Sequence, residues 1–266
     1  MKSYRIKMLL LTTLLTVVTA LSGQTNAPYH FSLKRDLLYT GGGVGLSLVG
    51  YALHQNVPNI SRSDLALRTP PRFDRFAIDL FSEKAAQASD GALFVSLGLP
   101  ALLVFSQDTR SDWAQLGLLY GEVLLFNQGF TDIIKSTVKR PRPYVLSPDF
   151  PVDQPIESND RAAFLSGHTS VSAASCFFMA RVFADYHPQS RLRPYVWGLA
   201  AGLPALTGYL RVKAGRHYLS DVVAGYALGA ALGYFVPALH RRSLRVKGLQ
   251  VAVGQGSAYL CYRFPN

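Results

Sequence analysis

The sequence has few charged residues for its length. Of its 266 residues, 16% are Asp, Glu, Lys or Arg, whereas 49% are apolar; an average soluble domain carries roughly a quarter charged residues. Acidic residues are fewer than basic ones, with 16 Asp and Glu against 27 Lys and Arg, so the formal net charge is +11. Such an apolar composition excludes a disordered chain. The basic excess favours a membrane surface or a phosphorylated substrate as partner, and the apolar runs argue against nucleic acid.

Cysteine is scarce as well. Cys176 lies in an apolar run and Cys261 in the C-terminal tail. Their spacing fits no metal-binding pattern, and we expect both thiols to be free, with a disulfide as the alternative. The sequence also lacks a carboxylate cluster suited to Mg²⁺, an internal repeat and a low-complexity tract. Its length suits one domain, or at most two small ones.

The N-terminus has the pattern of a secretory signal peptide. A basic start, MKSYRIK, precedes a short apolar stretch and then small and polar residues. We expect residues 1–23 to form this signal, with cleavage between Ala20 and Ala27. An uncleaved membrane anchor is the alternative. In either case the protein leaves the cytoplasm or enters the membrane.

Six further apolar segments predict helices, because they are too long for strands and rich in Gly, Ala and Leu. A full membrane span needs about 20 apolar residues, which only the third and sixth segments approach. The set predicts an all-α, membrane-associated bundle of about six helices with small-residue packing. Buried helices of an envelope protein that only partly enters the bilayer are the alternative. The segments are Leu37–His54, Ala92–Ser106, Trp113–Ile134, Ser170–Ala184, Tyr195–Leu210 and Val222–Leu239.

The remaining segments flank this predicted core of residues 92–240. Residues 28–91 hold the first apolar segment and a polar connection, in which residues 73–81, FDRFAIDLF, have apolar positions at helical spacing. This stretch predicts either an interfacial amphipathic helix or a helix that caps the bundle. Residues 241–266 begin as a basic segment and continue as an alternating tail around Gly254 and Gly256. That alternation predicts an accessory β-hairpin.

Three polar clusters lie at the ends of predicted helices. The first has Lys135 and, after six residues, Arg142 followed by Pro143; an arginine fork and a lysine point charge suit a phosphate. Lys139 and Arg140 lie between them, and we expect both to face solvent or lipid head groups. A basic loop at a membrane surface is the alternative for Lys135 as well.

The second cluster is FLSGHTS, with Ser166, Gly167 and His168. Small residues at a helix start let backbone N–H groups approach an anion, and His168 beside them could donate a proton to a leaving oxygen. Helix capping by Ser166 or Thr169 is the alternative.

The third cluster is LRVKAGRHYLSD, with Arg211, His217 and Asp221. If His217 is already helical, Asp221 lies one turn further on the same face. Its carboxylate can then accept a hydrogen bond from one ring nitrogen and leave the other free to attack. A helix-start histidine with a solvated aspartate is the alternative.

The three clusters would meet at one end of an up-and-down bundle. The converging residues would then bind the equatorial oxygens of a phosphoryl group, attack its phosphorus and protonate the leaving group. The sequence therefore favours phosphoryl transfer over the structural alternatives.

Together the clusters resemble the motifs of the type 2 phosphatidic acid phosphatase family, whose fold is shared with vanadium-dependent haloperoxidases and bacterial class A acid phosphatases. The family pattern is Lys-x6-Arg-Pro, Pro-Ser-Gly-His and Ser-Arg-x5-His-x3-Asp. Here it occurs as Lys135–Pro143, LSGH at 165–168 and LRVKAGRHYLSD at 210–221. Leu165 replaces the usual proline and Leu210 the usual serine.

The resemblance implies a phosphatase that needs no metal or other cofactor. It implies His217 as the nucleophile that forms a phosphohistidine, Asp221 as its orienting partner and His168 as the general acid. The phosphate cradle it implies consists of Lys135, Arg142, Ser166, Gly167 and Arg211.

The expected substrate is a phosphorylated lipid such as phosphatidate, phosphatidylglycerol phosphate or a polyprenyl diphosphate. A broad-specificity periplasmic acid phosphatase, a vanadate-dependent haloperoxidase and a non-enzymatic protein that binds anionic lipid are the alternatives. Basic segments at 180–193 and 240–247 lie on the bundle end opposite the predicted site. Since basic loops prefer the cytoplasm, we expect the protein in the inner membrane of a bacterial envelope, with its site facing the periplasm. The sequence does not indicate an oligomeric state.

Overall fold

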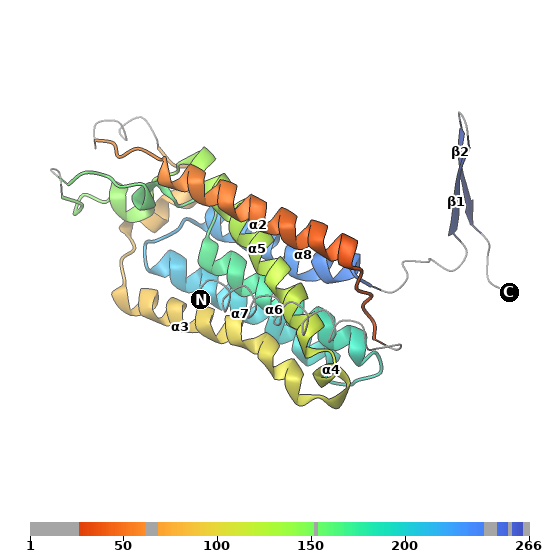
Figure 1. Cartoon of the computed structure of the whole chain (residues 1–266). Coiled ribbons are helices and arrows are strands. Elements are labelled where there is room, and N and C mark those ends of the chain that lie inside the picture. Colours follow the sequence, from red (N-terminus) through yellow and green to blue (C-terminus); the bar gives the residue numbers. More distant parts are fainter. Residues whose placement is uncertain (1–26, 62–68, 152–153, 242–248, 255–256, 263–266) are drawn as a thin grey trace, which may run out of the picture.

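The computed structural model describes residues 27–61, 69–151, 154–241, 249–254 and 257–262. Long helices packed side by side form the body (Figure 1), and all six predicted apolar segments are helical. The predicted signal peptide lies outside the described residues. The long helices are α2 (Leu33–Gln55), α3 (Glu83–Gly98) with its 3₁₀ continuation η3 (Leu99–Phe105), α5 (Trp113–Val138), α6 (Gly167–Tyr186), α7 (Arg193–Lys213) and α8 (Leu219–Leu239); the short ones are η2 (Arg72–Asp79), α4 (Gln107–Arg110), η4 (Pro143–Leu146) and η5 (Asn159–Arg161).

Helix α6 is the centre of the bundle and packs against α3, α5, α7 and α8. Most of its side chains are buried, and many are Ala or Ser. Helix α8 approaches it through a glycine every fourth residue: Gly225, Gly229 and Gly233. A Cβ atom at any of these positions would collide with a backbone carbonyl oxygen of α6 or of the residue before it. This close approach fixes the start of α8 beside the start of α6.

The predicted start of one helix is wrong. Helix α3 begins at Glu83 rather than Ala92, since its first turns, EKAAQASDG, lack the apolar residues that marked the segment. Ser82 caps this start, with its hydroxyl accepting a hydrogen bond from the Ala85 N–H at 3.2 Å. The early start brings Asp90 into the same end of the bundle as the three polar clusters.

The stretch at residues 73–81 caps the bundle. Helix η2 buries Asp74 and Ala77 beside the start of α8, as the capping alternative predicts. Phe73, Phe76 and Phe81 on the same stretch are exposed, so contact with a membrane surface stays a prediction.

The alternating tail forms two strands, β1 (Leu249–Gly254) and β2 (Ser257–Tyr262), which pair antiparallel with Leu249 opposite Tyr262. Cys176 is buried and free, as expected. The prediction for Cys261 stays untested, because the side chains of the strands are not described.

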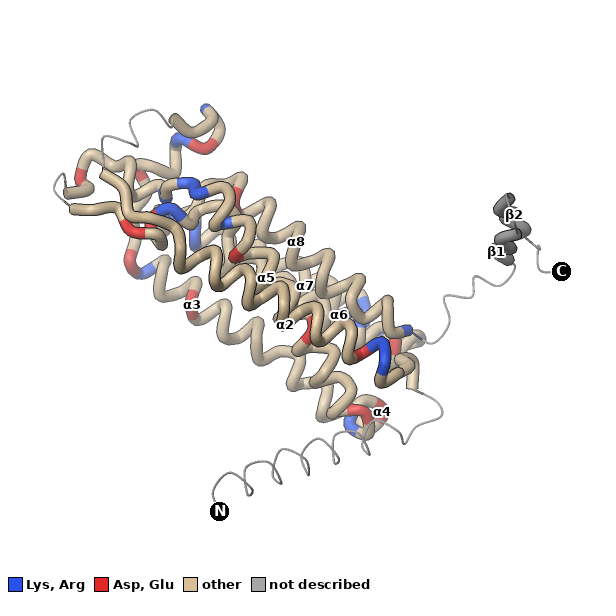
Figure 2. The backbone as a smooth tube through the Cα atoms, turned by 45° about the horizontal axis from the view of Figure 1, so that its top comes forward, with Lys and Arg blue, Asp and Glu red and all other residues tan. Residues whose placement is uncertain are grey.

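Charged residues gather at the two ends of the bundle, and the middle turns carry few (Figure 2). Two helical stretches within the described residues are long and apolar enough to cross a membrane: Glu83–Phe105 and Leu219–Leu239. Large apolar side chains such as Leu38, Phe94 and Val223 are exposed. Charged ends and an apolar waist are typical of a bundle in a lipid bilayer.

Candidate active site

A polar cavity of about 430 Å³ lies where the three clusters meet. The three predicted clusters, at the end of α5, the start of α6 and the α7–α8 loop, thus lie together at one end of the bundle, and α3 adds residues that were not predicted. Cationic side chains outnumber carboxylates in the wall, which suits an anion. The lining residues are Glu83, Ala86, Asp90, Lys135, Arg142, Asn159, His168, Arg211, Arg216 and His217.

His217 is buried in the loop that leads into α8. It precedes the helix and is not part of it. Its Nδ1 donates a hydrogen bond to the Ala163 carbonyl oxygen at 2.8 Å, whereas Oδ2 of Asp221 lies 3.7 Å from Nδ1. The expected hydrogen bond from His217 to Asp221 is therefore wrong, and a backbone carbonyl fixes the tautomer instead. A proton held at Nδ1 leaves the Nε2 lone pair available as a nucleophile.

Burial and neighbouring cations keep this imidazole neutral. Burial lowers the pKa of His217 well below its usual range, and the positive charges of Arg142, Arg211 and Lys135 lower it further. An unprotonated ring at neutral pH is what a nitrogen nucleophile requires.

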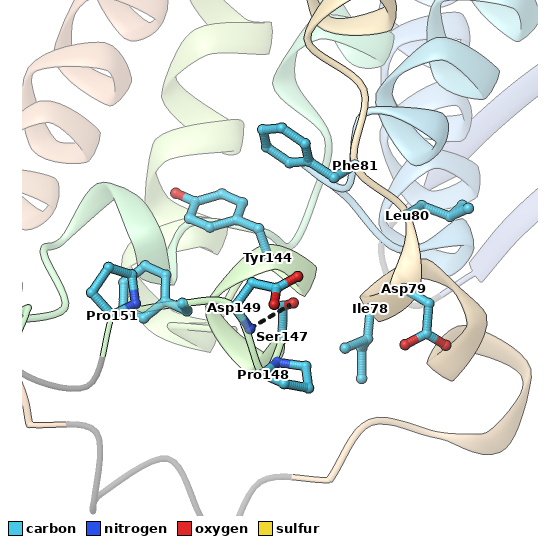
Figure 3. Close-up of a pocket in the computed structure, with 10 residues that line it drawn as sticks. Ile78, Asp79, Leu80, Phe81, Tyr144, Ser147, Pro148, Asp149 and Pro151 are labelled. Atoms are coloured by element: carbon cyan, nitrogen blue, oxygen red, sulfur yellow. Dashed lines mark hydrogen bonds between the residues drawn. The ribbon is translucent and has the colours of Figure 1, made fainter.

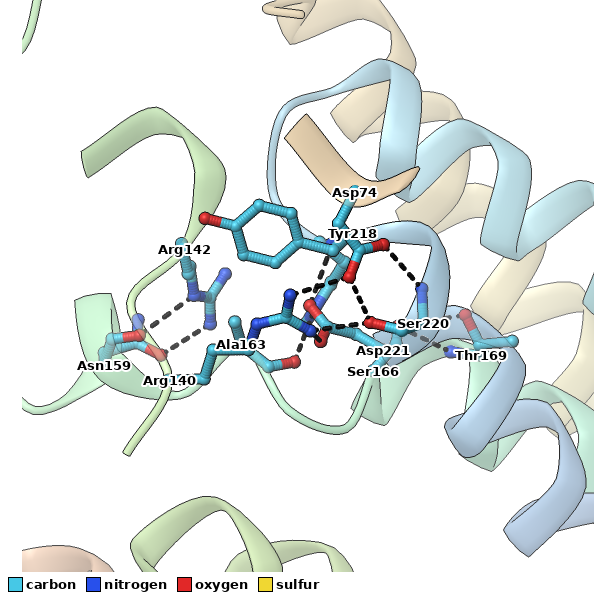
Figure 4. Close-up of polar contacts among 11 residues, drawn as sticks. Asp74, Arg140, Arg142, Asn159, Ala163, Ser166, Thr169, Tyr218, Ser220 and Asp221 are labelled. Atoms are coloured by element: carbon cyan, nitrogen blue, oxygen red, sulfur yellow. Dashed lines mark hydrogen bonds and ion pairs between the residues drawn. The ribbon is translucent and has the colours of Figure 1, made fainter. Parts of the chain in front are cut away.

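Asp221 belongs to a buried ionic network beneath His217. Its Oδ2 accepts from the Tyr218 N–H at 2.8 Å, and its Oδ1 pairs with Nη1 of Arg140 at 2.5 Å. Arg140 also binds Asp74 at 2.7 Å and Ser220 at 2.7 Å, and its guanidinium lies 4.0 Å from the Tyr218 ring centroid (Figure 4). The prediction that Arg140 faces solvent or lipid is therefore wrong. The expectation for Lys139 stays a prediction.

His168 faces a carboxylate that the motifs did not include. Its Nε2 lies 2.8 Å from Oδ1 of Asp90 on α3, and Arg211 Nη1 is 3.6 Å from the same oxygen. Burial and the charges of Arg211 and Lys135 lower the pKa of His168 to about 4, against the opposing effect of Asp90. These surroundings keep His168 neutral at physiological pH, and the negative charge of a substrate phosphate would favour its protonation.

Two arginines present guanidinium groups to the cavity. Arg142 is held by Asn159, through Nε to the backbone oxygen at 2.9 Å and through Nη2 to Oδ1 at 2.8 Å. Arg211 donates from Nη1 to the Ser89 hydroxyl at 3.2 Å. Its buried Nε has no hydrogen-bond partner among the described residues. An orphaned guanidinium N–H in a cationic cavity suits an anionic ligand.

Gly167 and Ser166 support the cavity in ways that differ from the prediction. A Cβ at Gly167 would come within 3.3 Å of Nζ of Lys135, so the glycine leaves room for the ammonium group. The Ser166 hydroxyl is fully buried and caps α6 through the Thr169 N–H at 3.5 Å. Capping is therefore its observed role, and it does not line the cavity.

Arg216, Asp90 and Asn159 are cavity residues that the sequence reasoning did not single out. Arg216 directly precedes His217, and its position within the third motif could have drawn attention to it. No sequence signal marked Asp90 or Asn159. Among the residues that the structure describes, no group of three or more His, Cys, Asp or Glu could hold a metal ion.

Comparison with known proteins matches the same part of the chain. The family model of the PAP2 superfamily matches residues 116–245, which include all three motifs and end before the β1–β2 ribbon. Two curated relatives are similar in sequence. Lipid A 4'-phosphatase of Porphyromonas gingivalis is 26% identical over 54% of this chain and 58% of its own length. Phosphatidylglycerophosphatase B of Bacillus subtilis is 28% identical over 52% of this chain and 64% of its own length.

The chain thus spans less than two thirds of the length of either relative. The structure of a transmembrane PAP2-type phosphatidylglycerolphosphate phosphatase from Bacillus subtilis is also similar, with 20% identity and a TM-score of 0.46 over 77% of this chain and 98% of the other.

Proposed function

We propose that this chain, whose residues 116–245 match the family model of the PAP2 superfamily, is a phosphatase that hydrolyses the phosphate ester of a membrane lipid through a phosphohistidine at His217. The observation that carries the proposal is the 2.8 Å hydrogen bond from His217 Nδ1 to the Ala163 carbonyl. It assigns the proton to Nδ1 and the reactive lone pair to Nε2, in a cavity wall that also contains Lys135, Arg142 and Arg211.

Substrate binding is electrostatic. Lys135, Arg142 and Arg211 neutralise the phosphate oxygens, and the unpartnered Nε of Arg211 gains an acceptor. These donors are held before the substrate arrives, Arg142 by Asn159 and Arg211 by Ser89. Preorganised cations stabilise the charge on the equatorial oxygens in the transition state.

The reaction has two balanced steps. Nε2 of His217 forms a bond to phosphorus while the bond from phosphorus to the lipid oxygen breaks, and protonated His168 gives its proton to that oxygen. A water molecule then attacks the phosphohistidine, His168 takes its proton, and the P–N bond breaks to release phosphate. No metal takes part in either step of this proposal.

The names of the two curated relatives support a phosphorylated lipid as the substrate class. Lipid A 4'-phosphatase and phosphatidylglycerophosphatase B are both named for phosphate esters of lipids. The charged ends and exposed apolar waist of this bundle support a membrane lipid over a soluble ester. Phosphatidylglycerol phosphate, phosphatidate, a polyprenyl diphosphate and a lipid-linked sugar phosphate are the candidates. We propose an inner-membrane location with the cavity facing the periplasm, because the connection between α6 and α7 at the opposite end is basic and basic loops prefer the cytoplasm.

Phosphate release from a panel of these lipids and p-nitrophenyl phosphate tests the proposal. The purified protein in detergent with EDTA should release phosphate, and His217→Ala should release none above background. Broad activity that favours soluble esters would instead support a general acid phosphatase. Equal activity of wild type and His217→Ala would refute the assignment of the nucleophile. If neither protein is active on the panel, the phosphatase proposal fails.

A further inference from the structure

A second cavity of about 630 Å³, whose lining residues are drawn in Figure 3, lies next to the phosphate cavity and differs from it in charge. Aromatic side chains, Tyr144, Phe81 and Phe150, form part of its wall. Asp79 and Asp149 are its only charged side chains among the described residues that line it. The two adjacent cavities therefore have opposite electrostatic character.

The two cavities share a wall. The Arg216 guanidinium lines the phosphate cavity and lies 5.2 Å from the ring centroid of Tyr144, which lines the second one. Tyr144 is two residues after Arg142, and its N–H donates to the Gly215 carbonyl at 3.2 Å. A group bonded to a phosphate at His217 would thus have the second cavity within reach, past Arg216.

Gly215 makes this close contact possible. Its φ of +68° lies in the left-handed region, and a Cβ there would collide with the Leu80 carbonyl oxygen. The loop before His217 therefore packs directly on Leu80 and Phe81, which line the second cavity. The same turn positions the nucleophile and the wall of the neighbouring cavity.

The side chains that line the second cavity indicate which kind of chemical group it can bind. Carboxylates accept hydrogen bonds from hydroxyl and amine groups, and Ser147 can donate or accept. Aromatic rings pack on the apolar face of a ring. Two carboxylates disfavour a second phosphate in this cavity, and the nearby Arg216 lines the phosphate cavity on the other side of the shared wall.

We propose that this second cavity is the leaving-group subsite, and that it receives a hydroxyl-bearing sugar ring to which the scissile phosphate is attached. The inference rests on the proposed phosphatase function and makes it more specific. It selects a phosphomonoester on a lipid-linked sugar over a polyprenyl diphosphate, whose leaving group is itself a phosphate.

The test compares wild type with the double variant Asp79→Asn and Asp149→Asn. Asp108→Asn is the matched control, since Asp108 is exposed on α4 and lines neither cavity. The substrates are a glycolipid with a phosphate on a glucosamine ring, undecaprenyl diphosphate, phosphatidate and p-nitrophenyl phosphate. The leaving group of the last has no hydroxyl or amine group for the two carboxylates to bind, so this substrate reports whether the catalytic groups are intact.

In wild type, kcat/KM should be highest for the glycolipid. The double variant should lower that value roughly tenfold, the loss expected for hydrogen bonds to charged acceptors, and should raise activity on the diphosphate. Its activity on p-nitrophenyl phosphate and that of Asp108→Asn should stay at the wild-type level.

An active wild type whose substrate ranking is the same in the double variant would overturn the subsite but not the phosphatase. An equal loss on all four substrates would also overturn it, because the carboxylates would then act on the fold rather than on the leaving group. A wild type inactive on every substrate would refute both proposals.

Discussion

At the scale of single residues, the motifs identified the groups that line the cavity, and the structure added those that hold them in place. Lys135, Arg142, His168, Arg211 and His217 have motif spacings that predict one site, and all five line it. Their partners come from distant positions, which a single sequence does not connect. His217 shows what spacing alone cannot predict. Its spacing from Asp221 suggested that this carboxylate accepts the hydrogen bond from Nδ1, but the backbone carbonyl of Ala163 accepts it.

Asp90 carries the first prediction. Its carboxylate is the group that raises the pKa of His168 against burial and two cations. Asp90→Asn should therefore lower that pKa below about 4, so that less of the general acid is protonated at any higher pH. The alkaline limb of the kcat profile should move to lower pH, and kcat at neutral pH should fall roughly tenfold or more.

A pH–rate profile of Asp90→Asn beside Asp108→Asn checks this prediction. The control should keep the wild-type profile, because Asp108 is exposed at the far end of the bundle. A uniform loss of rate at every pH would contradict the role assigned to Asp90, since a change in the pKa of His168 must alter the shape of the profile.

Arg140 carries the second prediction. It pairs with two buried carboxylates, Asp74 and Asp221, which lie 66 and 81 residues away in the chain. Arg140→Ala would leave both carboxylates buried without their cation, at a cost of about 3–5 kcal/mol in the free energy of unfolding. Thermal unfolding in detergent should show a large fall in Tm, together with loss of activity.

Arg110→Ala is the control for that experiment, because Arg110 is exposed and lies on α4, away from the cavity. Its free energy of unfolding should change by no more than about 0.5 kcal/mol, as for an ordinary surface substitution, so its Tm should stay close to that of the wild type. An Arg140→Ala variant that unfolds like Arg110→Ala would mean that Arg140 is solvated, as its position in a basic loop had suggested.

At the scale of elements, the apolar runs predicted six helices, and all six are present. What the runs could not show is which helices touch. The sequence is glycine-rich in α2, α7 and α8 alike. Only the tertiary structure shows at which of these glycines a larger side chain would collide with a neighbouring helix. Gly229 faces the α6 backbone, whereas Gly202 on α7 has nothing within 4 Å of its position.

This contrast gives the third prediction. Gly229→Ala should lower the free energy of unfolding by about 1–3 kcal/mol or more, because the added methyl must push α8 away from the Ser170 carbonyl. Gly202→Ala should be neutral or stabilise by up to about 1 kcal/mol through helix propensity. Equal Tm values for the two variants would contradict the packing of α8 on α6.

The start of helix α3 could not be predicted from hydropathy. Its first two turns are polar or small, and hydropathy alone placed its start at Ala92. The Ser82 cap and the propensity of EKAAQ extend it, and the extension is what delivers Asp90 to His168. Cap signals are weaker than apolar periodicity, so a functional residue in the first turns of a helix is easily missed.

At the scale of the whole molecule, charge and apolar surface divide the bundle into two ends and a waist (Figure 2). The connection between α6 and α7 lies at the end opposite the cavity, and the α5–α6 connection lies at the cavity end. Basic residues near the former predict that it faces the cytoplasm. This orientation puts the proposed substrate phosphate on the outer side of the membrane.

The fourth prediction tests that orientation with two introduced cysteines in a Cys261→Ser background. Glu157→Cys and Gln189→Cys occupy exposed positions in the two connections, and Cys176 is buried and should not react. A membrane-impermeant maleimide should label Glu157→Cys in intact spheroplasts and Gln189→Cys only after permeabilisation. The reverse pattern would place the cavity in the cytoplasm.

The central claim is that His217 Nε2 becomes covalently phosphorylated. The most direct measurement uses His168→Ala with p-nitrophenyl phosphate, whose leaving group departs without a general acid, followed by an alkaline quench and peptide mapping by mass spectrometry. Because this variant lacks the base that activates water in the second step, phosphate should accumulate on the peptide that contains His217 and be absent when His217→Ala is added. Phosphate on a different residue, or turnover with no adduct in either protein, would contradict the mechanism.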